Sequence, residues 1–128
     1  MECLVDTQAL LWWDSAPERI GPEALKILTD QKSTLFVSHA SIWELAIKIR
    51  LGKLSLPDEL ERWVADSVQG SGFNLFPLGL DVILATQSLA MHHSDPFDRI
   101  LISQALVRAW PVISSDVQWD AYPINRIW

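Results

Sequence analysis

The chain carries the stretch CLVDTQALLWW at residues 3–13, and this stretch decides the class of fold that we expect. The run Cys3–Val5 is short and apolar, as is typical of a buried strand, and it ends at Asp6. The apolar residues at 9–13 then indicate a helix. A strand that leads directly into a helix is the first unit of an α/β fold.

The remainder of the sequence repeats this alternation. Apolar runs predict further strands at 35–37, 73–78 and 111–113 and an edge strand at 124–127. Helical spacing, with end signals such as Pro22 and Gly52, predicts helices at 22–28, 40–51, 57–68, 81–91 and 95–110, and a short turn or helix after Asp116. We therefore expect an α/β fold, with a mainly parallel sheet covered by helices on both faces.

Length and composition fit one folded domain over residues 1–128. Hydrophobic residues make up 49% and charged residues 20%, far from the composition of disordered chains. No apolar run approaches the roughly 18 residues of a membrane span, and the first residues lack the features of a secretory leader. We expect a cytoplasmic protein without membrane association. The single cysteine, Cys3, is expected to be a small buried core residue.

Charge limits the ways in which the protein can act on nucleic acid. The formal net charge of −6 argues against a protein that holds nucleic acid by a broad basic surface. An acidic enzyme can still cleave RNA, because carboxylates that bind divalent cations make a site negative until the ions arrive. The seven tryptophans are many for this length, and they indicate either an exposed aromatic surface for a partner or ordinary core packing.

Acidic residues follow the predicted strands. Asp6 comes directly after the first strand, Asp116 follows the fourth, and Glu44 lies one turn into the helix after the second. Asp95 and Asp98 mark the start of the long helix. Ligands of parallel sheets bind beyond the carboxyl ends of the strands, so four of these acids are predicted to converge on one sheet edge. Such hard oxygen ligands suit Mg²⁺ or Mn²⁺, and paired ions about 4 Å apart support phosphodiester cleavage.

Each acid also has a purely structural interpretation. Asp6 and Asp116 are suited to cap the turns that follow them. Asp95 precedes a proline at the first helical position, which is typical of a helix cap, and we favour that role for it. Glu44 is placed to pair with Lys48 one helical turn later.

The three histidines do not have the spacing of a zinc site. His39, His92 and His93 match neither a cysteine–histidine pattern nor the His-Glu-x-x-His motif, so we predict structural or surface positions. His92 or His93 lining a substrate groove is the less favoured alternative. The sequence has no Gly-rich phosphate loop, no Gly-x-Ser-x-Gly elbow and no dinucleotide fingerprint.

Four sequence blocks, in this order, resemble one protein family. They are LVDTQALLWW at 4–13, SHASIWELAIK at 38–48 with LGKL at 51–54, HSDPFDRILISQA at 93–105, and ISSD at 113–116 with Tyr122 and Pro123 downstream. Together they resemble PIN-domain proteins of the VapC toxin type, over essentially the whole chain. The resemblance implies a three-layer α/β/α sandwich whose clustered acids bind Mg²⁺ or Mn²⁺ and hydrolyse RNA.

The resemblance also implies roles for individual residues. By position, the family's acidic places are taken by Asp6, Glu44, Asp98 and Asp116, with Asp95 as an auxiliary acid. The fourth block has Ser114 and Ser115 where many relatives have Thr-Arg-Asn, so both direct ligation by Asp116 and ligation through water stay open. Thr7 and Ser115 are expected to orient ligands or water. Candidates for phosphate contacts are Lys48, Arg50, Lys53 and Arg99, with solvated surface charge as the alternative for the first three.

For the biological role, the family implies the toxin of a toxin–antitoxin pair. We expect an RNA substrate, an antitoxin partner whose peptide covers the acidic groove, and a homodimer joined through helices. The expected reaction is in-line hydrolysis of a phosphodiester, with divalent cations stabilising the developing charge. The alternatives are a non-catalytic PIN-fold module that holds RNA or a protein, and a metal-dependent DNA nuclease.

Overall fold

The computed structural model describes residues 1–128, and its centre is a five-stranded parallel sheet. The strands are β1 (Glu2–Val5), β2 (Thr34–Ser38), β3 (Asn74–Phe76), β4 (Val112–Ile113) and β5 (Arg126–Ile127). Their order is β3-β2-β1-β4-β5, and every neighbouring pair is parallel. The chain therefore runs outward from β1 to β3 and then returns to the other side of β1. In parallel sheets, this reversal marks the place where ligands bind, beyond the carboxyl ends of β1 and β4.

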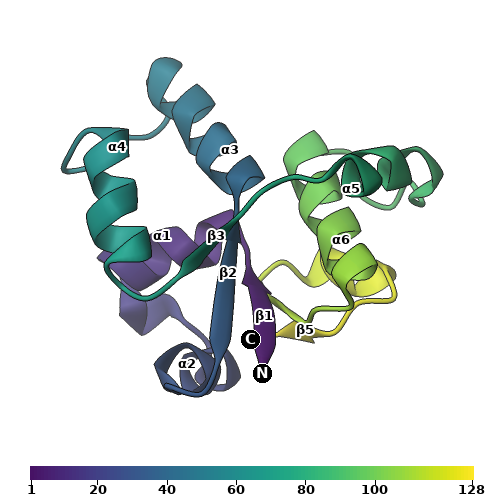
Figure 1. Ribbon diagram of the computed structural model, residues 1–128, viewed down its shortest axis with the longest axis horizontal. Coiled ribbons are helices and arrows are strands. Elements are labelled where there is room, and N and C mark those ends of the chain that lie inside the picture. Colours follow the sequence, from purple (N-terminus) through teal and green to yellow (C-terminus); the bar gives the residue numbers. More distant parts are fainter.

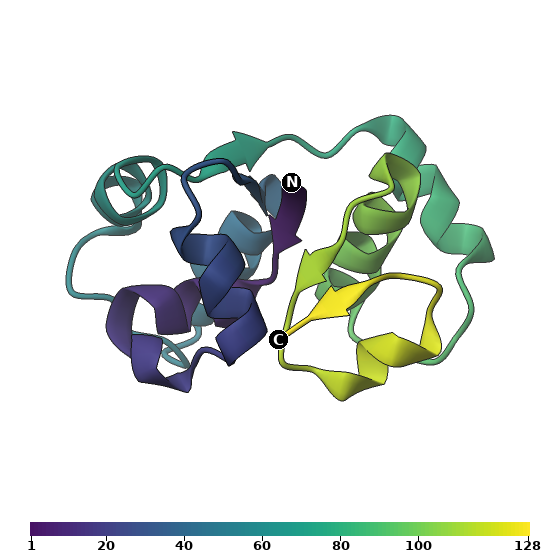
Figure 2. The ribbon, with the colours of Figure 1, turned by 90° about the horizontal axis from the view of Figure 1, so that it is seen from below.

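Helices cover both faces of the sheet (Figures 1 and 2). On one face lie α1 (Thr7–Ser15), α2 (Pro22–Thr29) and α4 (Leu60–Trp63), and on the other lie α5 (Leu80–Ala85) and α6 (Pro96–Arg108). The remaining α-helix, α3 (His39–Arg50), starts at the end of β2 and contacts both α1 and α6. The predicted three-layer α/β/α sandwich is confirmed.

The residues of β1 show why this sheet is covered on both faces. Cys3 and Val5 belong to the core under α1 and α2, whereas Leu4 belongs to the core under α6. All three side chains are fully buried. Because successive residues of a strand point to opposite faces, a continuous apolar run supplies both cores at once. The structure thus places Cys3 in the core, as the sequence predicts.

Two helices differ from their predicted ranges. The helix expected over 81–91 ends at Ala85 and continues only as a 3₁₀ turn, η3 (Thr86–Ser88). Beyond that point the carbonyl groups bind the side chain of Arg99 instead of continuing a helical ladder. The helix expected over 57–68 begins at Leu60 and changes at Val64 into a π-helix, η2 (Val64–Gln69).

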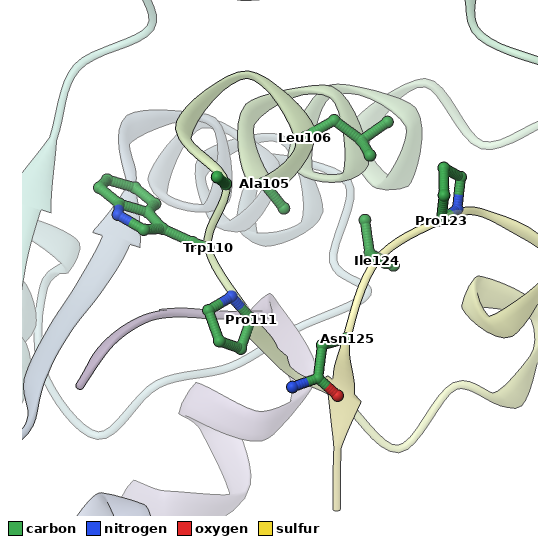
Figure 3. A pocket seen from close by; sticks show the side chains of 8 residues that line it. Ala105, Leu106, Trp110, Pro111, Pro123, Ile124 and Asn125 are labelled. Carbon is green, nitrogen blue, oxygen red and sulfur yellow. The ribbon is translucent and has the colours of Figure 1, made fainter.

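Two further 3₁₀ turns complete the fold, η1 (Pro17–Arg19) and η4 (Val117–Ala121). None of the helices combines the length and the apolar character that crossing a bilayer requires. A hollow of about 290 Å³ lies near the start of β4, between the end of α6 and the segment that leads to β5 (Figure 3). None of its lining side chains is ionisable, so it offers neither charged metal ligands nor groups for acid–base chemistry.

Candidate active site

A second hollow, of about 260 Å³, lies at the carboxyl ends of β1 and β4, and we call it the acidic pocket. Its lining is almost wholly polar, with Leu11 as the single hydrophobic residue. The full lining is Asp6, Thr7, Gln8, Leu11, Glu44, Lys48, Asp95, Asp98, Ser115 and Asp116. The four acids that the sequence predicts to converge therefore lie around one hollow; their action as metal ligands stays a prediction.

Asp6 and Asp116 reach the pocket from the ends of adjacent strands. Asp6 follows β1 and caps α1, because its Oδ1 accepts a hydrogen bond from the backbone N–H of Ala9 at 2.7 Å. Asp116 caps η4 by accepting from the N–H of Gln118 at 3.0 Å, and its own N–H donates to Ser114 Oγ at 3.1 Å. The capping interpretation is thus correct for both acids, and capping fixes their backbones at the edge of the pocket.

Glu44 and Asp98 come from two helices that contact each other, α3 and α6. Glu44 is buried, and its Oε2 lies 2.7 Å from Lys48 Nζ, as the one-turn spacing predicts. Asp98 lies in the first turn of α6. Asp95 caps that helix by accepting from the N–H groups of Phe97 and Asp98 at 2.8 and 3.3 Å, which is the role favoured from the sequence.

His93 is the site residue that the sequence analysis undervalued. Its Nε2 lies 3.2 Å from Asp98 Oδ2 and 3.3 Å from Asp116 Oδ2, and its side chain is largely buried. Together the three residues form a compact group of ligand-type atoms. The available signal was the position of His93 two residues before Asp95, in the same block as Asp98.

The predicted substrate-contact residues divide into two groups. Lys48 and Ser115 line the acidic pocket, as does Thr7, whose hydroxyl donates to Ser41 Oγ at 2.9 Å. Arg99 does not line the pocket. Its guanidinium donates four hydrogen bonds of 2.9 to 3.2 Å to backbone carbonyls, those of Thr86, Leu89, Ala90 and His93. We therefore correct its assignment from a phosphate contact to a residue that fixes the segment between α5 and α6.

Two of the basic residues predicted to contact phosphate lie outside the acidic pocket. Arg50 and Lys53 are exposed and do not line it, which agrees with the surface-charge interpretation. Lys48 is therefore the single cation among the lining residues. One ammonium group faces five carboxylates, so the pocket has a large excess of negative charge.

Burial, with this excess charge as a smaller cause, raises the pKa of two acids. Burial raises the pKa of Asp6 to about 6, and repulsion from Asp116 and Glu44 adds to the effect, against hydrogen bonds from Ser114 and Ala9. Burial also raises the pKa of Asp98 to about 7, with further repulsion from Asp95, although His93 opposes it. Buried carboxylates without compensating charge are unfavourable, so the pocket is suited to a bound cation.

Sequence comparison relates the chain to characterised proteins. A model of the PIN domain matches residues 3–125. A region of 59 residues, 46% of the chain, is 37% identical to "Ribonuclease VapC16" of Mycobacterium tuberculosis. That match spans 40% of the length of the mycobacterial protein.

Solved structures share the fold at low sequence identity. VapBC2 from Rickettsia felis, in a crystal structure with a DNA fragment from its promoter, has a TM-score of 0.71 at 11% identity, over 99% of both chains. FitAB, bound to an IR36 DNA fragment, has a TM-score of 0.61 at 14% identity, over 98% of this chain and 93% of the other. Because the family model covers nearly the whole sequence and the architecture agrees with it, the chain belongs to the PIN domain family.

Proposed function

We propose that residues 1–128 form one PIN domain that cleaves RNA internally with Mg²⁺ or Mn²⁺, as the cytoplasmic toxin of a toxin–antitoxin pair. One observation carries the proposal. Four carboxylates from segments far apart in the sequence line one hollow at the point where the strand order reverses, namely Asp6, Glu44, Asp98 and Asp116. The partial match to a protein named as a ribonuclease supports RNA as the substrate.

The acidic pocket fits a hard divalent cation by its donor set. Its ionisable oxygen donors are all carboxylates, and no cysteine lines it. Mg²⁺ and Mn²⁺ favour such oxygen ligands, whereas Zn²⁺ sites in proteins favour histidine and cysteine. Burial raises the pKa of the Asp6 carboxyl more than its hydrogen bonds with Ser114 and Ala9 lower it, so a cation would stabilise the ionised form. When bound, divalent cations supply the charge stabilisation that phosphodiester hydrolysis requires.

The other lining residues have distinct tasks in the proposed reaction. Lys48 is half exposed and is the one cation of the pocket, so we expect its ammonium group to contact a phosphate oxygen of the RNA. Ser115 lines the pocket, and we expect its hydroxyl to orient water or a ligand there. The hydroxyl of Thr7 donates its proton to Ser41 Oγ, so we expect Thr7 to orient ligands or water together with Ser41.

Cleavage of a structured RNA with Mg²⁺ or Mn²⁺ tests the proposal. We expect Asp6→Asn and Glu44→Gln to lower the rate by at least about 100-fold, because each removes a carboxylate from the proposed metal ligands. Glu23→Gln is the matched control, since Glu23 is an exposed acid that pairs with Lys26 and does not line the acidic pocket. Undiminished cleavage by Asp6→Asn or Glu44→Gln would remove that acid from the mechanism.

The same assay separates the alternatives. A matched single-stranded DNA should resist cleavage if the protein is a ribonuclease, and preferential cleavage of the DNA would identify a DNA nuclease. Binding of the RNA without cleavage, with either metal, would identify a non-catalytic PIN-fold module. In that case Asp6→Asn should bind the RNA as the wild type does.

We further propose an antitoxin partner and a homodimer. The two solved structures named above support an antitoxin partner, because VapBC2 and FitAB are toxin–antitoxin complexes. For the homodimer, the support is an apolar surface on α3 and α6. Trp43 is 58% exposed there and packs edge-to-face on Phe97, beside a small hollow lined also by Ala40, Pro96 and Ile100. We call this surface the α3–α6 apolar face.

A further inference from the structure

The ring of His93 joins two acids of the pocket without lining the pocket itself. Its Nε2 lies within 3.3 Å of one carboxylate oxygen of Asp98 and one of Asp116. Those carboxylates line the acidic pocket, whereas His93 is absent from the lining and its side chain is 11% exposed. The histidine therefore contacts both acids without lining the hollow.

The hydrogen bond at His93 Nδ1 determines whether Nε2 carries the ring proton. The backbone N–H of Asp95 points at His93 Nδ1 over 3.2 Å. A backbone N–H only donates, so Nδ1 must present its lone pair and the ring proton of a neutral imidazole resides on Nε2. An Nε2–H group donates hydrogen bonds to carboxylates and has no lone pair for a metal ion.

The backbone of His93 is held on two sides. Tyr122 Oη accepts hydrogen bonds from the N–H groups of His92 and His93 at 3.1 and 2.9 Å, and it donates to the carbonyl of Ala90 at 2.7 Å. The guanidinium of Arg99 binds the carbonyls of Ala90 and His93. The backbone of His93 is thus fixed by Tyr122 and Arg99, and both ring nitrogens form hydrogen bonds. The position of the ring relative to the two acids is therefore well defined.

We propose that His93 is a positioning residue of the acidic pocket, which orients Asp116 by a hydrogen bond from Nε2–H, contacts Asp98 through the same nitrogen, and does not ligate the metal. The inference rests on the proposed metal dependence. Asp98 and Asp116 belong to different elements, α6 and the turn after β4, and no backbone pairing between those elements sets their separation. The contact of both carboxylates with His93 Nε2 sets this separation instead, in the manner of the outer partners of ligands at other metal sites.

Mn²⁺ binding, measured by calorimetry on the full chain, tests this role. We expect His93→Ala to weaken Mn²⁺ binding by about tenfold, the usual effect of losing an outer partner of a ligand. His93→Gln keeps an N–H donor on a side chain of similar reach, so it should restore most of the affinity. His92→Ala is the matched control, because the ring of His92 packs on Tyr122 and contacts neither acid. Thermal melts of the metal-free variants establish that each is folded.

Electron spin-echo spectroscopy of the Mn²⁺-loaded wild type supplies the second readout. We expect no directly coordinated nitrogen. A coordinated nitrogen that disappears in His93→Ala would make His93 a ligand and overturn the inference, as would unchanged Mn²⁺ affinity in folded His93→Ala. A wild type that binds no Mn²⁺ would overturn the metal-dependent function and this inference together, whereas the first two outcomes leave the proposed function intact.

Discussion

Two features of the environment of Asp6, its helix-capping hydrogen bond and its burial, favour opposite charge states. As the cap of α1 it is stabilised by the N–H of Ala9, but burial beside other acids disfavours its ionised form. The raised pKa of about 6 shows that burial outweighs the cap. A residue that is unfavourable to folding in this way is typical of a functional site, where binding of a ligand restores the balance.

The pKa of Asp6 predicts how stability depends on pH. Between the ordinary value of 3.8 and about 6, the folded protein binds more protons than the unfolded chain, so the free energy of unfolding falls as pH rises. Asp98, with a pKa of about 7, contributes with the same sign. The metal-free protein should therefore melt at a higher temperature near pH 5 than near pH 8, in calorimetric scans with a chelator.

Asp6→Asn isolates the contribution of this one acid. Asparagine keeps the oxygen that accepts from Ala9 and removes the charge, so near pH 8 the metal-free variant should be more stable than the wild type by up to about 3 kcal/mol. The difference should disappear near pH 4. A variant less stable than the wild type near pH 8 would contradict the raised pKa of Asp6.

Among the elements, α6 is capped by a single side chain at its start. Asp95 accepts hydrogen bonds from two N–H groups of the first turn, and Pro96 occupies the first helical position. We expect Asp95→Ala to lower the free energy of unfolding by about 1 kcal/mol in urea titrations. Asp95→Asn, which retains the cap, should be nearly as stable as the wild type. Equal stability of the alanine variant would show that the cap is unimportant.

The segment between α5 and α6 depends on Arg99. Its four hydrogen bonds to backbone carbonyls require the planar, five-donor guanidinium, which lysine cannot replace. Arg99→Lys should therefore lower the free energy of unfolding by about 2 kcal/mol in urea titrations. A variant of unchanged stability with a raised KM for RNA would restore the original assignment of Arg99 as a phosphate contact.

For the molecule as a whole, the proposed metal site predicts that divalent cations stabilise the folded state. A cation that binds only the folded state raises stability by mass action, by about 2.7 kcal/mol at a concentration of 100 Kd. We expect Mn²⁺ to raise the melting temperature of the wild type and of Glu23→Gln, and to have a much smaller effect on Glu44→Gln. Equal shifts in all three proteins would place the ion outside the acidic pocket.

The α3–α6 apolar face predicts the oligomeric state. Trp43 exposes most of its indole, which is unfavourable unless another surface covers it. Sedimentation should show a dimer for the wild type, and Trp43→Ala should shift the equilibrium toward the monomer. Leu25→Ala is the control, because Leu25 is also partly exposed but lies on α2, in the opposite layer. A monomeric wild type, or a dimer unaffected by Trp43→Ala, would exclude this face as the dimer contact.

The sequence by itself determined the order of strands and helices and four acids of the candidate site. These features depend on local chemistry. An apolar run such as Cys3–Val5 predicts a strand, and the acid that follows it, Asp6, must then lie at the carboxyl end of the sheet. The cap formed by Asp95 was equally predictable, because its partners are the next N–H groups along the chain.

Only the tertiary structure decided the contacts of His93 and Arg99. Both depend on how the segment after α5 folds back against Tyr122 and α6, through hydrogen bonds between residues up to 32 positions apart. No spacing rule predicts such contacts, because they follow from packing and not from helical or strand periodicity. For the same reason the early end of α5 was not predicted: a side chain from the next helix binds the carbonyl groups that a longer helix would have used.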